Sequence, residues 1–225
     1  LSSLLGLELT EFGIIISEDT QGASLYMSGF IEGVSYAAFQ FGANALVDEQ
    51  FITYLQNPGD TEEALYAAYG IYDSRVPSIL NLAGPTASTV IQAAIDANGW
   101  EIPAYIVGVA YDSFTEGLLP DGTSVVLTSA MTYYDKAVYE ILSDYAAGDF
   151  AGGTQRMFDY ASGGIGLPAD NPAFSSGTLD AMTYIFEQMD LNWLQVPALG
   201  DGPITILAPP PVPVPTEIPT IPPIP

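Results

Sequence analysis

The residues of this sequence that could do chemistry are nearly all carboxylates. Asp112 and Glu116 follow an apolar run, and two carboxylates at the carboxyl end of a parallel strand could in principle serve acid–base hydrolysis. The acidic clusters Glu18–Asp19, Asp48–Glu49 and 60–63 contain the oxygen ligands that calcium prefers. No EF-hand spacing accompanies these clusters, and any acidic chain offers such pairs, so we interpret them as solvated loops or helix caps. The sequence therefore predicts no metal site and no catalytic residues.

Two residue types that carry much of enzyme chemistry are missing. The chain has no Cys and no His, which excludes Cys/His zinc sites, Ser-His-Asp and Cys-His relays, and haem bound through its usual side chains. The Gly-rich segment Ser162–Leu167 (SGGIGL) lacks the GxxxxGK[ST] spacing of a phosphate loop, so we interpret it as a turn. We predict that the protein is not an enzyme and needs no cofactor.

The charge balance limits the partners that the chain can bind. The formal net charge is −24, from 27 acidic residues against 3 basic ones. Three basic side chains cannot neutralise the phosphates of a nucleic acid, and the remaining field repels anionic lipid. No apolar stretch reaches the roughly 18–20 residues of a transmembrane helix. We therefore expect no nucleic-acid partner and no membrane insertion, and we place the protein outside the cell or on its surface after removal of an N-terminal leader.

Strand and helix patterns alternate along most of the chain. Apolar β-branched runs such as Phe12–Ser17 predict buried strands, and three- and four-residue apolar steps predict the helices between them. This alternation is typical of a parallel sheet with helices on both faces, so we predict an α/β three-layer sandwich with a mainly parallel sheet. The predicted strands cover 12–17, 45–55, 78–83, 105–111, 125–130 and 155–160, and the predicted helices cover 23–41, 60–72, 86–98, 133–147 and 178–191.

The composition changes at residue 200, where an extended Pro-rich C-terminal tail begins. Ten of the 18 prolines lie in the last 23 residues, and the residues between them are mostly apolar, unlike those of a flexible linker. We predict a lobe at 1–199 and a tail at 200–225 that serves contact or assembly. A stalk is the alternative. The tail residues expected to make contacts are apolar: Ile204, Ile206, Leu207, Val212, Val214, Ile218 and Ile221.

Two blocks of the sequence resemble one protein family. Leu127–Leu167 is similar to the LTS, AVYD, GxFxGG and GGVGL-like series of the Bmp/PnrA (Med-type) basic membrane lipoproteins, and Ile106–Asp112 (IVGVAYD) is similar to that family's GVDSD strand. The resemblance implies a type I periplasmic-binding fold and nucleoside binding for an ABC importer. Family members have two lobes that close on the ligand, and a chain of this length has room for the second lobe only.

The ligand motif of the family is altered in this chain. The first Asp of GVDSD falls on Ala110, and the family's Lys falls on Thr132. The resemblance implies that the remaining ligand contacts are polar residues after two strands: Asp112, Ser113, Thr132 and Asp135. Asp135 alternatively lies in the first turn of a helix, where the helix dipole favours an acid.

Two functions remain in competition. The altered motif, the low charge and the apolar tail favour an extracellular structural subunit that self-assembles into a filament, tube or sheath, with copies of itself as partners. Tyr66, Tyr69 and Tyr72 at helical spacing fit either a core edge or contacts between subunits. The alternative function is a surface solute-binding protein that takes a small polar, nucleoside-like ligand for an ABC importer.

Overall fold

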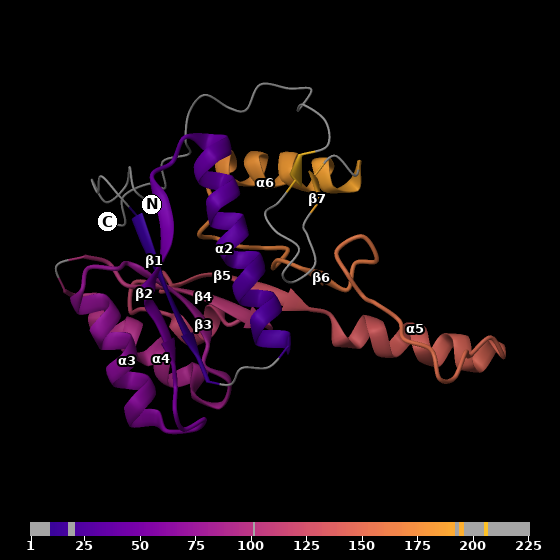
Figure 1. Cartoon of the computed structure of the whole chain (residues 1–225), viewed down its shortest axis with the longest axis horizontal. Coiled ribbons are helices and arrows are strands. Elements are labelled where there is room, and N and C mark those ends of the chain that lie inside the picture. The colour runs from indigo at the N-terminus through magenta and orange to yellow at the C-terminus, as the bar shows by residue number, and fades with distance from the viewer. Residues whose placement is uncertain (1–9, 18–20, 101, 192–193, 196–204, 207–225) are drawn as a thin grey trace.

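The computed structural model describes residues 10–17, 21–100, 102–191, 194–195 and 205–206, and Figure 1 shows their arrangement. A six-stranded sheet has the order β2-β1-β3-β4-β5-β6, and β7 and β8 form a second, two-stranded sheet. The strands are β1 (Thr10–Ile16), β2 (Ala45–Tyr54), β3 (Ser78–Leu82), β4 (Tyr105–Ala110), β5 (Val126–Thr132), β6 (Ile165–Gly166), β7 (Leu194–Gln195) and β8 (Thr205–Ile206). The helices are α2 (Gln21–Phe41), α3 (Thr61–Asp73), α4 (Ala87–Ala97), α5 (Tyr134–Ala147) and α6 (Ser176–Asp190), with 3-10 turns η1 (Gly84–Thr86) and η2 (Phe114–Gly117).

The large sheet is mainly parallel. Strands β1 to β5 pair with one another in parallel, and β6 adds an antiparallel edge to β5. The connection from β1 to β2 runs across the sheet in one direction, and those to β3 and β4 run in the other, so right-handed crossovers place α2 on one face and α3 and α4 on the opposite face. The predicted α/β three-layer sandwich is therefore confirmed.

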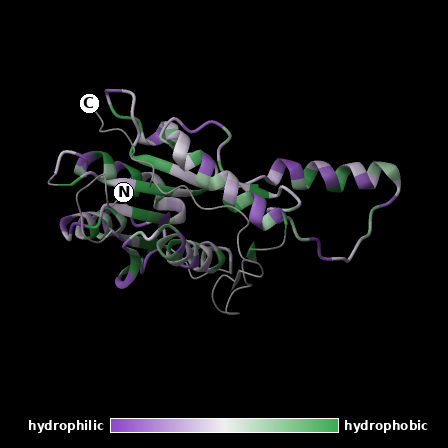
Figure 2. Cartoon of the chain, turned by 90° about the horizontal axis from the view of Figure 1, so that it is seen from above, coloured by the Kyte–Doolittle hydropathy of each residue, from purple (hydrophilic) through white to green (hydrophobic). Residues whose placement is uncertain are grey.

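The core lies on both faces of the sheet. On one face α3 and α4 cover Ile15 and Ile79, and on the other α2 covers Ile14 and Leu80. Successive side chains of a strand point to opposite faces, so the apolar run at 12–16 of β1 supplies both layers. We call the six-stranded sheet with α2, α3 and α4 the body. Figure 2 shows the body with the central strands coloured mostly as hydrophobic. Of the three regularly spaced tyrosines in α3, Tyr72 is buried and Tyr66 is exposed.

Helix α3 begins where its sequence indicates. The Asp60 carboxylate accepts hydrogen bonds from the backbone N–H groups of Glu62 and Glu63, at 3.0 and 3.1 Å. The Glu63 carboxylate in turn accepts the backbone N–H groups of Gln56 and Asn57, at 2.7 and 3.1 Å. Asp60 thus caps the helix N-terminus, where backbone donors lack partners, and Glu63 holds the loop that precedes the helix. Their positions agree with the interpretation of this acidic cluster as a helix cap.

Helix α5 stands away from the body in both Figure 1 and Figure 2. None of its residues is buried. We call its exposed large side chains the α5 apolar face, which comprises Tyr134, Val138, Tyr139, Ile141, Leu142 and Tyr145.

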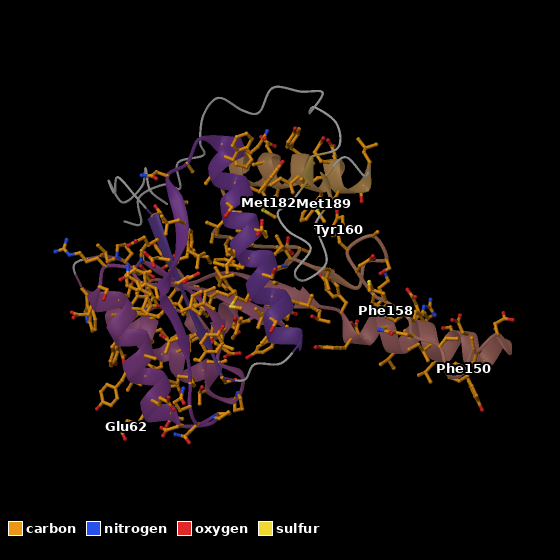
Figure 3. The ribbon with its side chains drawn as sticks, viewed as in Figure 1. Glu62, Phe150, Phe158, Tyr160, Met182 and Met189 are labelled. Atoms are coloured by element: carbon orange, nitrogen blue, oxygen red, sulfur yellow. The ribbon has the colours of Figure 1, made fainter. Side chains whose placement is uncertain are left out.

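The strand predicted at 155–160 does not form. Arg156 donates instead to the carboxylates of Glu140 and Asp144 on α5, at 2.8 and 2.6 Å, and its guanidinium lies 5.1 Å from the centre of the Phe158 ring. The segment thus runs back along α5, from Phe150 at the far end to Phe158 nearer the base (Figure 3). The strand prediction for 155–160 is wrong, because the segment lies along a helix and has no strand beside it to pair with.

Both edges of the large sheet are poor surfaces for adding a strand. Along edge strand β2 the register with β1 shifts between Phe12↔Val47 and Ile14↔Ile52, so 48–51 bulge out, and the Asp48 carboxylate accepts the Gln50 backbone N–H. Strand β6, at the other edge, has two residues. Bulges, acids and short strands are devices that prevent edge pairing.

The first part of the predicted tail pairs within its own chain. In β8, Ile206 lies opposite Leu194 of β7 in an antiparallel register. The other predicted tail contacts lie outside the described residues: Ile204, Leu207, Val212, Val214, Ile218 and Ile221.

Candidate functional site

The carboxyl ends of the parallel strands meet at one edge of the sheet. Strand β1 ends at Ile16, and the next residue, Ser17, is buried and donates its backbone N–H to the Leu82 carbonyl of β3 at 3.1 Å. Strands β4 and β5 end beside them at Ala110 and Thr132. The first turns of α2 lie near the end of β5, where α5 leaves the body (Figure 1). Ligands of open parallel sheets bind at such an edge, which we call the carboxyl edge.

Strand β4 ends in a strained turn at this edge. Ala110 has a φ of 70°, and the Tyr111 backbone N–H donates to the Val109 carbonyl at 2.9 Å, which closes a γ-turn. A positive φ is uncommon for a residue with a Cβ, and such strain persists only where surrounding contacts hold it. Sequence reasoning missed this turn, because alanine carries no signal for a positive φ.

Two buried serines support the turn. The Ser113 and Ser129 hydroxyls lie 3.2 Å apart, and the Ser113 backbone N–H donates to Ser129 Oγ at 3.3 Å. A Cβ on Gly108 would lie 2.5 and 2.6 Å from the two hydroxyl oxygens, so only glycine fits there. The glycine inside the strand was the sequence signal for this close approach. The hydroxyl of the predicted ligand contact Ser113 therefore supports the turn.

Asp112 and Glu116 are each engaged with another group. The Asp112 carboxylate accepts the Phe114 backbone N–H at 3.0 Å, at the start of η2. A side-chain hydrogen bond to Glu116 raises the pKa of Tyr111. Both interactions order the loop after β4.

Thr132 lies at the end of β5 and contacts a residue that the sequence analysis did not identify. Its hydroxyl is 2.5 Å from the hydroxyl of Tyr26 on α2. The next residue, Tyr133, donates its backbone N–H to the Gly164 carbonyl at 2.9 Å and its phenol to the Leu167 carbonyl at 3.0 Å. These bonds fix the junction between β5 and α5. No pattern in the sequence links Tyr26 to this junction.

Asp135 is exposed in the first turn of α5. This is the helix position that the alternative reading of Asp135 described, and a carboxylate there is favoured by the helix dipole. The four predicted ligand contacts thus follow two neighbouring strands, with Asp112 and Ser113 after β4 and Thr132 and Asp135 at the end of β5.

The Gly-rich segment Ser162–Leu167 begins with a turn, at 162–164, and continues into β6. Lys136 of α5 donates to the Ser162 carbonyl at 2.5 Å, so a cation does lie beside it. The backbone N–H groups of Ser162 and Gly164 bond to the side chain and carbonyl of Asp159, which leaves them unavailable to a phosphate. Hydrogen bonds from Ser162 lower the pKa of Asp159.

Two findings hold for the described part of the chain. Within it, no group of three or more His, Cys, Asp or Glu side chains could hold a metal ion. None of its helices combines the length and apolar character needed to cross a bilayer.

Comparison with known proteins places the chain in a family. The family described as ABC transporter substrate-binding protein PnrA-like (Bmp) matches residues 21–192. Two proteins named CD4+ T-cell-stimulating antigen, from Listeria monocytogenes and Listeria innocua, are each 28% identical over 160 residues, which cover 68% of this chain and 43% of theirs. The match thus spans less than half the length of these relatives.

Solved structures show the same fold. A solute-binding protein of an ABC transporter system from Aeropyrum pernix K1 gives a TM-score of 0.68 at 17% identity and covers 89% of this chain and 60% of that one. A transcriptional activator of the comK gene from Bacillus halodurans gives 0.64 at 18% identity and covers 87% and 61%. At such identities the likeness establishes the fold alone.

The family match corrects the main functional prediction. A filament, tube or sheath built from copies of this chain is wrong, because the family is one of substrate-binding proteins. The sheet edges agree with the correction, since the bulge in β2 and the short β6 discourage strand addition, and Ile206 pairs within its own chain. The resemblance of Leu127–Leu167 and Ile106–Asp112 to the Bmp/PnrA proteins is confirmed. The chain belongs to the PnrA-like (Bmp) family of ABC transporter substrate-binding proteins.

Proposed function

We propose that this chain forms a solute-binding lobe for an ABC importer and binds a small polar, nucleoside-like ligand at the carboxyl edge. The observation that carries the proposal is the family match over 21–192, which includes the turn after β4 and the β5–α5 junction. The role is capture of a solute without chemical change, outside the cell or at its surface. We propose a division into a lobe at 1–199 and an extended tail from 200 onward.

The charges near the edge favour a neutral ligand. The Lys136 ammonium donates to a carbonyl, and the Arg156 guanidinium is paired with two carboxylates of α5. Arg75 precedes β3 and therefore lies toward the opposite end of the parallel sheet. With a formal net charge of −24, the protein repels anions. A nucleoside fits this edge better than its phosphorylated form.

The α5 apolar face supports the need for a second lobe. Isolated helices of about 12–15 residues are marginally stable in water, and exposed apolar patches of a few hundred Å² mark interfaces. The whole of α5 lacks buried residues and leaves the body at the carboxyl edge. An α/β lobe that packed on α5 would also stand over that edge and complete a cleft for the ligand.

Titration calorimetry on the natural full-length protein tests this function. We expect adenosine, inosine or uridine to bind with a Kd of about 1 μM or tighter, near −8 kcal/mol. Adenosine monophosphate, which adds negative charge, should bind at least about tenfold more weakly, a difference of roughly 1.4 kcal/mol. Absence of heat with every nucleoside, or tighter binding of the phosphorylated form, would contradict the proposal.

A further inference from the structure

The contact between Tyr26 and Thr132 joins two parts of the chain at the carboxyl edge. The two hydroxyl oxygens lie 2.5 Å apart across a sequence separation of 106 residues. Both residues are partly buried, so the contact is shielded without being sealed from a ligand. The Tyr26 ring packs against the apolar cluster that contains Ile14, Ile16 and Leu80. The packed ring therefore holds the Tyr26 hydroxyl in a fixed position.

Thr132 differs from the other polar residues at the two strand ends. The Asp112 carboxylate caps η2, and the Ser113 hydroxyl is buried against Ser129. The Thr132 hydroxyl bonds to another hydroxyl, and each hydroxyl has one donor hydrogen and two acceptor lone pairs. Their mutual bond uses one donor and one lone pair, so the pair still offers a donor and several acceptors. That set matches the hydroxyl group of a ligand.

We propose that Tyr26 is a positioning residue that orients the Thr132 hydroxyl toward a ligand hydroxyl. The pair then forms a neutral contact point that discriminates against anionic ligands, because neither hydroxyl supplies positive charge. This inference rests on the proposed function, since it names a residue that prepares the same edge. It assigns to α2 a part in recognition that no sequence motif indicates.

Variants of the two residues test the pair in the full-length protein. Tyr26→Phe removes the phenol oxygen and keeps the packed ring, and Thr132→Val removes the other hydroxyl. The probes are inosine, uridine and ribose, titrated by calorimetry. We expect Tyr26→Phe to weaken binding about 3- to 10-fold, and Thr132→Val about tenfold or more, as for loss of hydrogen bonds. Thr132→Ser, which keeps the hydroxyl, should bind within about twofold of wild type.

The double variant distinguishes positioning from independent contact. If Tyr26 acts through Thr132, then adding Tyr26→Phe to Thr132→Val should weaken ligand binding by less than about a further twofold, because the effects of coupled sites are not additive. Tyr66→Phe on α3, whose side chain is 63% exposed, is the matched control and should leave the Kd unchanged. A purely structural role for Tyr26 would shift the urea midpoint of unfolding and leave the Kd of the folded protein as it was.

Each outcome decides the inference. An unchanged Kd in Tyr26→Phe, or additive losses in the double variant, would overturn it. If wild type binds ribose and no nucleoside, the nucleoside function fails while the same variants, titrated with ribose, still decide the role of Tyr26. If wild type binds none of the three probes, both proposals are overturned.

Discussion

Helices α4 and α5 differ in what their apolar sides contact. Helix α4 has 11 residues and buries five of them against the sheet, and α5 has 14 residues and buries none. The apolar side of α4 consists of alanines with Val90 and Ile91, which fit closely against strands. The α5 apolar face carries larger side chains that meet solvent. The body therefore contains the buried contacts that stabilise the fold, whereas α5 presents an exposed apolar face.

The largest expected difference comes from truncating one isoleucine in each region. Ile106 of β4 is fully buried, and Ile141 of α5 is 38% exposed. Ile106→Ala should lower the free energy of unfolding by about 2–5 kcal/mol, because it removes apolar contacts and leaves a cavity. Ile141→Ala should cost less than about 1 kcal/mol. Urea unfolding followed by circular dichroism measures both, and similar losses would mean that α5 belongs to the cooperative core.

A second pair of variants compares glycine-to-alanine changes beside the turn after β4 and on the open surface of a helix. Gly108→Ala should cost about 1–3 kcal/mol of unfolding free energy, because its Cβ would overlap the Ser113 and Ser129 hydroxyls. Gly29→Ala, in α2 with no atom within 4 Å of the new Cβ, should be neutral or gain about 0.5–1 kcal/mol.

A triple variant checks the cause of the Gly108 effect. Replacing both serines by alanine in the Gly108→Ala background removes the two oxygens that the new Cβ would meet. If the clash is responsible, Gly108→Ala should cost less there than in wild type when both are unfolded in urea. An equal cost in the two backgrounds would refute that mechanism.

The body should also lose stability at alkaline pH. Burial raises the pKa of Tyr72 above its ordinary value of 10.0, and its phenol donates to the Tyr105 carbonyl at 3.0 Å. The neutral phenol thus stabilises the fold fully below pH 10, and this contribution falls as the pH rises above 10. Tyr72→Phe should cost about 1 kcal/mol at pH 7 and flatten the alkaline decline.

Tyr139→Phe on α5 is the matched control for the alkaline experiment. This phenol is exposed, so its removal should leave the pH dependence of unfolding unchanged. Urea midpoints between pH 8 and pH 11 compare the three proteins. Loss of the decline in Tyr139→Phe, with Tyr72→Phe like wild type, would reverse the assignment of the two regions.

The smallest effect is expected from the ion pairs of α5. Arg156 lies 2.8 Å from Glu140 and 2.6 Å from Asp144, and all three side chains are substantially exposed. Arg156→Met should change the free energy of unfolding by less than about 1 kcal/mol, because exposed ion pairs contribute little. The difference should shrink further in about 1 M salt, where the Debye length is near 3 Å. A loss of several kcal/mol at either salt concentration would show that α5 is integral to the body.

The sequence could predict the body because its patterns record burial. The unbroken apolar run of β1 reflects a strand covered on both faces, and Asp60 before Glu62 and Glu63 indicates a capped helix. These signals are local, so they can be recognised without knowledge of the fold. The strand prediction at 155–160 failed because a short stretch of sequence does not say which element is available as a partner, and Arg156 binds α5.

The candidate site was only partly predictable. Asp112 and Thr132 could be placed at the carboxyl edge because they follow predicted parallel strands. The contact between Tyr26 and Thr132 joins residues that lie far apart in sequence, and the positive φ of Ala110 depends on the turn around it. Such features arise from tertiary packing, which a single sequence does not encode locally.

Hydrogen exchange on the full-length protein, with and without saturating inosine, shows whether the ligand binds at the carboxyl edge. We expect slower exchange with inosine at residues 110–113 and 132–135, and unchanged exchange in α3 and α4. Ligand binding protects the backbone that it orders, so the carboxyl edge should respond while the body, already stable, should not. Unchanged exchange at both segments, or protection confined to α3 and α4, would contradict the assignment of the ligand to the carboxyl edge.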